Sequence, residues 1–286
     1  MNIIKINIAG FVLELCSEKE IELEVGYEPF LSDETLVDVR IECISGLPLN
    51  PFAAMKPVFV AENEAQTFYS IYRTENQLGF LIYSQQNTTE IQQIAFLSED
   101  FKRWTVYSQP SVTGKLNPLR YPMGPIIMHY LTMNADAVMI HASCVSDGQK
   151  GRIFTGFSGA GKSTISGIWA DYGYQLINDD RLIIRRENNE YFVYNTPMYY
   201  ADMPKKTKLW SINLISHSPK NRMRKLSGAL AVSKVLAFCI QNNFDKSFIE
   251  SNLAFISGLC SAIGVYELGF VPDRNVVDFV LENEAK

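Results

Sequence analysis

The sequence predicts an α/β protein, α+β overall, with a β-rich N-terminal domain followed by a domain of alternating strands and helices. Apolar residues recur at every second position in segments 4–8, 21–25 and 37–41, which is typical of strands with one exposed face. Prolines and glycines then crowd segment 108–125 and interrupt regular structure. From residue 126 onward, short apolar runs alternate with runs of helical spacing. We therefore expect two domains, residues 1–115 and residues 116–286.

Further elements follow from the same periodicities. In the N-terminal part, segments 79–83, 91–97 and 103–107 are expected to be strands. In the C-terminal part, strands are expected at 137–140, 153–155, 174–177 and 265–270. Helices are expected at 126–133, from residue 164 to 172, and at 226–239, 248–262 and 275–284.

Composition excludes several classes of function. The 286 residues carry a formal net charge of −5, which argues against nucleic acid as the main partner, because binding to its backbone needs a basic surface. The sequence contains no run of eighteen apolar residues and no N-terminal targeting pattern, so we expect a cytoplasmic protein with no membrane partner. Its five cysteines are scattered without a CxxC pair, which favours reduced, mostly buried thiols.

The most informative motif is GxxxxGKS at residues 156–163, which lies between a strand-like run and a helix-like run. Its glycines allow successive backbone N–H groups to point into one concavity that holds phosphate. Lys162 can then reach the β and γ phosphates, and the Ser163 hydroxyl can bind Mg²⁺. Chance matches occur on the order of once in a hundred such chains. The residues expected to bind nucleotide are Gly156, Ser158, Gly159, Ala160, Gly161, Lys162, Ser163 and Thr164.

Two acidic residues and one histidine complete the candidate site. Asp179 and Asp180 follow the apolar run 175–177, where one carboxylate can face a metal ion and the other an incoming hydroxyl. A solvated acidic turn is the alternative interpretation of this pair. His141 directly follows the expected strand 137–140, ahead of the loop. A single histidine at a strand end is more often structural, and His129 and His217 are assigned that plain role.

The order of these motifs resembles the catalytic domain of HPr kinase/phosphorylase and of ATP-dependent phosphoenolpyruvate carboxykinase. The resemblance covers residues 139–182, with the runs IHAS at 140–143, GFSGAGKST at 156–164 and NDDR at 178–181. It implies a phosphoenolpyruvate carboxykinase-like P-loop domain, with ATP and Mg²⁺ as cofactors. It also implies that Ser163, Asp180 and His141 bind the metal ion, and that Asp179, with Lys162 and His141, forms the catalytic set.

The resemblance further implies a kinase that transfers the γ-phosphate of ATP to a hydroxyl, either of Ser in a peptide or protein or of a small molecule. HPr kinases are hexamers, so a homo-oligomer is consistent with the resemblance. The glycine-containing signature that shapes the HPr site has no clear copy in residues 183–209. Arg181 and the basic residues in segment 220–225 are candidate cations, although most such runs are solvated surface.

Two alternatives to a kinase are open. The first is a non-catalytic nucleotide-binding protein that regulates or assembles a peptide-modification system, since looser relatives of HPr kinase are found with such systems. The second is a generic ATPase or GTPase. No NKxD-like guanine motif follows the loop, which favours ATP over GTP.

Overall fold

The computed structural model describes residues 1–87, 90–133, 135–240 and 244–284. The chain forms two compact units. Unit 1 comprises Met1–Asn134, Pro197–Met203 and Asn242–Phe244, and unit 2 comprises Ala135–Thr196, Pro204–Gln241 and Asp245–Lys286.

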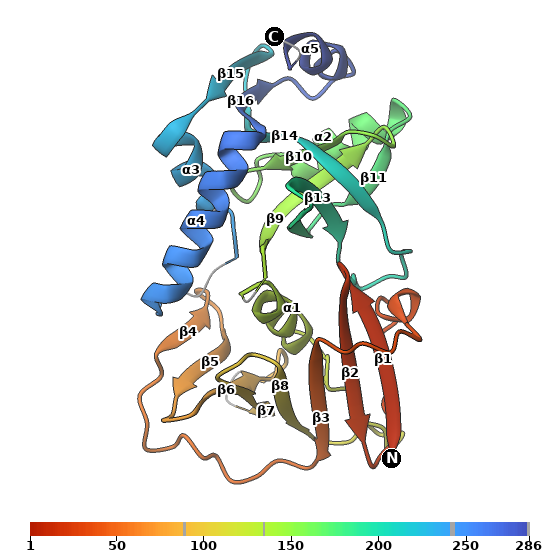
Figure 1. Cartoon of the computed structure of the whole chain (residues 1–286), viewed down its shortest axis with the longest axis vertical. Helices are drawn as coiled ribbons and strands as arrows, with labels where there is room; N and C mark the ends of the chain where they lie inside the picture. The colour runs from red at the N-terminus through yellow and green to blue at the C-terminus, as the bar shows by residue number, and fades with distance from the viewer. Residues whose placement is uncertain (88–89, 134, 241–243, 285–286) are drawn as a thin grey trace. The chain divides into compact units, whose positions relative to one another are not determined.

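Unit 1 contains one eight-stranded sheet and a helix (Figure 1). The strand order is β1-β2-β3-β8-β7-β6-β5-β4; β3 pairs in parallel with β2 and β8, and the other neighbours are antiparallel. Its elements are β1 Asn2–Ile8, β2 Phe11–Ser17, the 3-10 helix η1 Glu28–Phe30, β3 Val39–Ser45, β4 Phe59–Glu62, β5 Thr67–Arg73, β6 Gln77–Tyr83, β7 Ile91–Ser98, β8 Arg103–Ser108 and α1 Met123–Met133.

Aromatic side chains fix the two faces of this sheet. Tyr130 of α1 meets Phe80 and Trp104 edge to face, with ring centroids 5.5 Å and 5.8 Å away. On the other face, Phe52 stacks on Tyr72 at 4.6 Å, and a Cβ on Gly79 would come within 2.1 Å of the Phe52 ring. The β-rich expectation for the N-terminal part therefore agrees with the observed sheet.

Two expectations for the N-terminal part differ from the structure. Segment 21–25 is not a strand: it pairs only at Ile21, with Leu116, and Val25 is exposed. Alternation alone did not make a strand, because a strand needs backbone partners along its length. The Pro-rich segment also stays within unit 1, since Gln93 donates hydrogen bonds to the carbonyls of Asn117 and Pro118. The expected division after residue 115 therefore falls inside unit 1.

Unit 2 contains a second eight-stranded sheet and four helices within the described residues. Its elements are β9 Ala137–Ser146, β10 Gly151–Thr155, α2 Lys162–Asp171, β11 Gln175–Asn178, β12 Arg181–Glu187, β13 Glu190–Asn195, β14 Lys206–His217, β15 Arg222–Leu226, α3 Gly228–Leu236, α4 Lys246–Ala262, β16 Gly264–Phe270 and α5 Asn275–Asn283. Strands β12, β13, β14 and β15 were not among the expected elements.

Two long strands, β9 and β14, each take part in two sets of pairings. The first half of β9 pairs with β12, and its second half pairs with β10 and β11. The start of β14 pairs with β13, and the rest pairs in parallel with β10 and β16. The expected strand 137–140 is therefore too short, because β9 continues through His141 to Ser146 after it changes partners.

Helices cover both faces of the part of the sheet around β10. Ile153 packs in a core cluster with α3 and α4, whereas the next residue, Phe154, packs in a cluster with α2 and α5. Successive side chains of a strand point to opposite faces, so the two helix pairs lie on opposite sides. Helices α3 and α4 run beside each other (Figure 1). This layering agrees with the α/β class expected for the C-terminal part.

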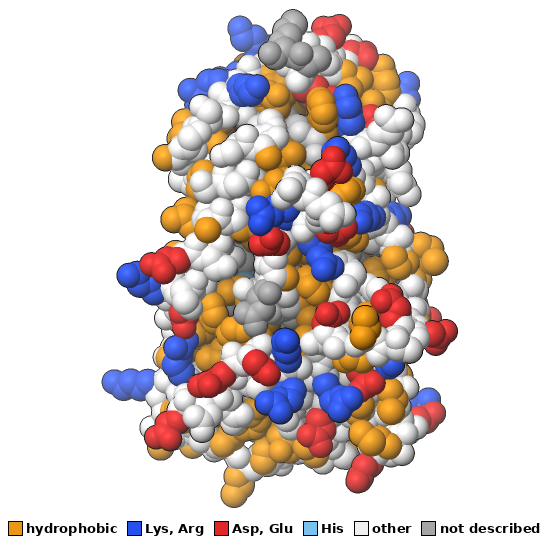
Figure 2. Space-filling model, viewed as in Figure 1, with side chains coloured by type: hydrophobic (Ala, Val, Ile, Leu, Met, Phe, Trp, Pro, Cys, Tyr) orange, Lys and Arg blue, Asp and Glu red, His pale blue; other side chains and the backbone are white. Residues whose placement is uncertain are grey.

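The charged side chains, the helices and the cysteines can each be compared with the composition. Figure 2 shows basic and acidic side chains intermixed on the face in view. None of the helices described is both long enough and apolar enough to cross a bilayer. All five cysteines are free and four are buried, which confirms the expectation of unpaired, mostly buried thiols.

Candidate functional site

The loop at residues 156–161 connects the end of β10 to the start of α2. Gly159 and Gly161 have φ angles of +78° and +95°, in the left-handed region that favours glycine. Gly161 precedes the first residue of α2, and no side chain caps this helix end. The first N–H groups of α2 are therefore oriented to bind an anion, as the motif predicts.

The loop is packed closely against the strands beneath it. A Cβ on Gly156 would lie 2.9 Å from the Ile215 carbonyl oxygen, and a Cβ on Gly161 would lie 2.9 Å from the Phe270 ring. Both approaches are closer than side-chain carbons normally tolerate, so these positions need glycine. The glycines therefore shape the concavity and also let it rest on β14 and β16.

Strand directions explain which residues meet at this loop. Strands β10, β14 and β16 are mutually parallel, so their C-terminal ends lie at the same edge of the sheet. These ends are Thr155, His217 and Phe270. Strand β9 is antiparallel to β10, with Ala142 opposite Thr155, so His141 lies beside the start of the loop. The Thr155 hydroxyl also donates a hydrogen bond to the His141 carbonyl at 2.8 Å.

Lys162 folds back over the loop. Its ammonium nitrogen lies 3.0 Å from the Gly156 carbonyl oxygen and 3.4 Å from that of Phe157. Burial lowers the pKa of Lys162, and the nearby Asp180 carboxylate acts in the opposite direction. Backbone carbonyls are weak partners for a cation, so a phosphate oxygen can replace them.

His141, Asp180 and Arg181 form a short chain of polar contacts at the same edge. His141 Nδ1 lies 3.5 Å from one Asp180 oxygen, and the Arg181 guanidinium lies 3.3 Å from the other. Burial and the charge of Lys162 lower the pKa of His141, against the opposing effect of Asp180. The imidazole is therefore neutral at pH 7.

Asn178 holds the two aspartates in a tight bend between β11 and β12. Its Oδ1 accepts hydrogen bonds from the backbone N–H groups of Asp179 at 2.7 Å and Asp180 at 3.1 Å. Its Nδ2 donates to the Thr196 carbonyl, and the Thr196 hydroxyl donates to the Arg181 carbonyl. The role of Asn178 was not predicted from the sequence, although an Asn directly before an acidic pair is typical of such a turn.

Most of the predicted site residues lie close together in the structure, and the contacts of Asp179 differ from those of the others. All eight loop residues lie on the loop or the first turn of α2. Asp180 and Lys162 both affect the pKa of His141, and Asp180 also affects the pKa of Lys162. Asp179 lies at the same bend, where its carboxylate makes no hydrogen bond or ion pair with other described residues. Its role as a base remains a prediction.

The chemistry of the donor atoms bears on the expected metal ion. The Asp180 carboxylate and the exposed Ser163 hydroxyl provide the oxygen ligands that Mg²⁺ prefers. The nitrogen of His141 is a donor that Mg²⁺ favours less. Within the residues described, no group of three or more His, Cys, Asp or Glu side chains is arranged to hold a metal ion. The oxygen donors therefore fit Mg²⁺ together with phosphate and water ligands.

His217, which was assigned a plain structural role, contacts the loop. Its Nε2 lies 3.0 Å from the Gly159 carbonyl oxygen, and its ring stacks on Phe270. A carbonyl oxygen can only accept, so Nε2 must carry the proton. No local pattern indicates this contact, because it depends on the parallel pairing of β10 and β14.

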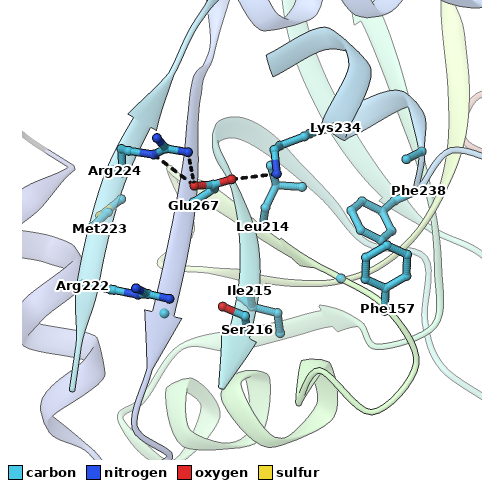
Figure 3. A pocket seen from close by; sticks show the side chains of 13 residues that line it. Phe157, Leu214, Ile215, Ser216, Arg222, Met223, Arg224, Lys234, Phe238 and Glu267 are labelled. Atoms are coloured by element: carbon cyan, nitrogen blue, oxygen red, sulfur yellow. Dashed lines mark hydrogen bonds and ion pairs between the residues drawn. The ribbon is translucent and has the colours of Figure 1, made fainter. Parts of the chain in front are cut away.

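A cavity of about 660 Å³ opens beside the first two loop residues (Figure 3). We call it the loop cavity. Its walls come from the loop, from strands β14, β15 and β16 and from the region of α3. The lining residues are Gly156, Phe157, Leu214, Ile215, Ser216, Arg222, Met223, Arg224, Lys234, Ala237, Phe238, Glu267 and Gly269. Its volume lies within the range of small-molecule sites, which is about 300–1,000 Å³.

Comparisons with known proteins include a weak structural likeness. No protein-family model and no curated protein matches the chain. Among solved structures, the Hpr(Ser) kinase/phosphatase from Coxiella burnetii is similar at a TM-score of 0.30 with 14% sequence identity, over 51% of this chain and 90% of that chain. A likeness this weak does not establish a shared family. The case for function therefore depends on the residues of this chain.

Proposed function

We propose that the chain is an ATP-dependent kinase of the HPr-kinase-like type, which transfers the γ-phosphate to a hydroxyl. The observation that carries the proposal is that Lys162, His141 and Asp180 lie close together beside a glycine-rich loop. This loop leads directly into helix α2. A loop that only holds phosphate needs no histidine and acidic bend at its mouth. The acceptor is a Ser hydroxyl of a peptide or protein, or the hydroxyl of a small molecule.

The loop and Lys162 would bind and orient the triphosphate. The N–H groups of the loop and of the first turn of α2 surround the phosphates, and Lys162 exchanges its contacts with Gly156 and Phe157 for phosphate oxygens. Ser163 and Asp180 would hold Mg²⁺, which supplies charge neutralisation on the β and γ phosphates. The ordered bend made by Asn178 keeps Asp180 in place for this task.

Asp179 would receive the proton of the acceptor hydroxyl. The hydroxyl oxygen forms a bond to the γ phosphorus while the bond from phosphorus to the β–γ bridging oxygen breaks, which leaves ADP. The transition state of phosphoryl transfer is loose, so the proton leaves late and a carboxylate is a strong enough base. Positioning and charge neutralisation supply most of the rate enhancement.

His141 would act as a neutral partner of Asp180. Because its pKa is lowered, the imidazole adds no charge at neutral pH, and its Nδ1 lies 3.5 Å from the carboxylate that faces the metal site. A neutral imidazole can orient this carboxylate without weakening its negative charge.

A non-catalytic regulatory protein is the second candidate. The observation that favours it is unit 1, a separate sheet of eight strands that is available for a partner. In that case nucleotide would bind in the same loop, but no acceptor would be phosphorylated. A generic ATPase is the third candidate, and it would release phosphate to water without an acceptor.

The kinase proposal is tested by phosphoryl transfer from radiolabelled ATP with Mg²⁺ to peptide and metabolite pools. We expect a labelled product, and a loss of about 100-fold or more in its rate of formation in Asp179→Asn, because the general base is removed. Asp171→Asn, at the exposed end of α2, is the matched control and should keep the full rate.

Three outcomes separate the candidates. ATP binding without any labelled acceptor would favour the regulatory protein. Release of phosphate at the same rate with or without acceptor pools would favour the ATPase. Equal rates of transfer in Asp179→Asn and the unaltered protein would remove Asp179 from the catalytic set.

A further inference from the structure

The floor of the loop cavity consists of two rows of side chains that cross three strands in register. One row contains Leu214, Glu267 and Arg224, and the other contains Ser216, Gly269 and Arg222. The second row lies nearer the C-terminal ends of β14 and β16, where the phosphate loop rests. The two rows therefore place their side chains at different depths from the loop.

The two arginines of the floor differ in their partners. Arg224 and Lys234 both pair with Glu267, at 2.6 Å and 2.8 Å, so this acid is shared between two cations (Figure 3). Arg222 forms no ion pair with any residue of the described ranges. Three basic side chains thus face one acidic side chain, and the cavity carries an excess of positive charge beside the loop.

Gly269 makes room for Arg222. A Cβ at this position would lie 2.6 Å from the Arg222 Nε and 2.9 Å from its Cγ. The Arg222 side chain therefore lies directly over β16 at Gly269, with its charged end in the cavity (Figure 3). A cation held this way is suited to recognise a carboxylate or phosphate.

The opposite wall of the loop cavity is apolar. Phe157, whose side chain is 78% exposed, meets Phe238 edge to face at a centroid distance of 5.2 Å. Ala237 also lines the cavity and follows α3, as Phe238 does. Ligand sites are lined mainly by apolar and aromatic side chains, so this wall suits the apolar body of a bound molecule.

The cavity lies at the γ-phosphate end of the loop. In this motif the lysine reaches the β and γ phosphates, and the Lys162 nitrogen lies 3.0 Å from the Gly156 carbonyl, which lines the cavity. The nucleoside of ATP extends from the α phosphate, at the other end of the chain of phosphates. A molecule bound in the loop cavity would therefore lie close to the γ phosphate, which is the group that is transferred.

We propose that the loop cavity binds the phosphoryl acceptor, and that the acceptor carries an anionic group on an apolar body close to its hydroxyl. This inference rests on the proposed kinase function. Arg222 binds the anion, Phe157 and Phe238 cover the apolar body, and the hydroxyl points toward the loop. Glu267 holds Arg224 and Lys234 away from the phosphates of ATP.

Matched pairs of probes test the required charge. The peptide pair is acetyl-Phe-Ser-Asp-amide and acetyl-Phe-Ser-Asn-amide, and the small-molecule pair is 4-(hydroxymethyl)benzoate and 4-(hydroxymethyl)benzamide. Each pair differs only in a carboxylate against an amide of the same shape. Binding to the full chain is measured by calorimetry, without nucleotide and with saturating Mg²⁺ and a non-hydrolysable ATP analogue.

We expect the carboxylate member of at least one pair to bind about tenfold tighter than its amide, the effect of one charged hydrogen bond. Arg222→Gln should remove this preference and leave the affinity of the amide unchanged. Gly269→Ala, which displaces the arginine, should do the same. Lys225→Gln is the matched control, because Lys225 lies on the same strand but does not line the cavity. The pair that responds distinguishes a peptide acceptor from a small molecule.

Each remaining outcome overturns the inference. Equal affinities within both pairs, no binding by any probe, or an unchanged preference in Arg222→Gln would show that the cavity selects no anion. Competition between the ATP analogue and the probes would assign the cavity to the nucleoside. If the analogue binds while the charge preference is absent, the acceptor inference fails and the kinase proposal stands. If the analogue does not bind at all, the kinase proposal fails whatever the probes show.

Discussion

Two cations near opposite ends of strand β10, Arg152 and Lys162, differ in the groups that they contact. At its start, the buried Arg152 guanidinium donates to both oxygens of Glu284, at 3.0 Å and 3.1 Å, and to Asp147 at 3.2 Å. Beyond its other end, the Lys162 ammonium has only carbonyl partners within the loop. The first cation is neutralised by carboxylates, which stabilises the fold, whereas the second has only carbonyl partners among the described residues, which phosphate oxygens would replace in the proposed function.

The largest expected effect concerns Arg152, at the start of β10. Arg152→Met should lower the free energy of unfolding by about 3–5 kcal/mol, because it leaves a buried carboxylate without a partner. The side chains of Arg152 and Glu284 are 2% and 4% exposed, so water cannot replace the lost contact. Urea denaturation followed by tryptophan fluorescence measures the change, since Trp169 lies against this arginine.

A double variant serves as the control for this prediction. Arg152→Met combined with Glu284→Met removes both charges and should recover part of the lost stability. If Arg152→Met is as stable as the unaltered chain, the ion pairs of Arg152 do not stabilise the fold, and the contrast with Lys162 is wrong.

The second largest expected effect concerns Lys162, beyond the other end of β10. Lys162→Ala should lower the rate of phosphoryl transfer by about 100- to 1,000-fold, because it removes a preorganised charge from the γ-phosphate. The free energy of unfolding should change by less than about 1 kcal/mol, since only contacts to loop carbonyls are lost. Calorimetric titration with Mg²⁺-ATP should show a parallel loss of affinity. Unchanged affinity would contradict the assignment of the phosphate loop.

The smallest effect concerns the fixing of the loop. His217→Ala should weaken ATP binding by about fivefold, because it removes one neutral hydrogen bond to the Gly159 carbonyl. His217→Gln retains an N–H donor and should recover part of that affinity. The Michaelis constant for ATP should change more than the turnover number, since His217 positions the loop and does not touch the acceptor. An equal effect of the Ala and Gln variants would show that the Phe270 stacking matters instead.

Local patterns were sufficient for the loop and for its strand and helix. The glycine spacing and Lys162 appear directly in the sequence, and so does the acidic pair after an apolar run. The α/β alternation of the C-terminal part follows from periodicity, which reflects burial of one face at a time. The strand 21–25 and the boundary after residue 115 could not be decided this way, because both depend on which distant backbone groups are available to pair.

Contacts between distant strands determined the rest of the site. Asn178 and Thr196 meet only because β12 and β13 pair beside the acidic bend, and His217 meets Gly159 only because β14 runs parallel to β10. The two rows under the loop cavity need the register of three strands at once. No spacing along the chain carries this information.

The sequence by itself determined that this chain has a GxxxxGKS loop, with Lys162 and the Ser163 hydroxyl, and two adjacent carboxylates after a later apolar run, a set that predicts phosphate binding. The loop motif depends on residues that are neighbours along the chain, where backbone geometry alone fixes their positions. Only the tertiary structure decided that Arg222 of β15 lies beside that loop without an ion-pair partner among the described residues, while Arg152 at the start of β10 is neutralised. Whether a charge is paired depends on strand register and burial, which are properties of the folded chain.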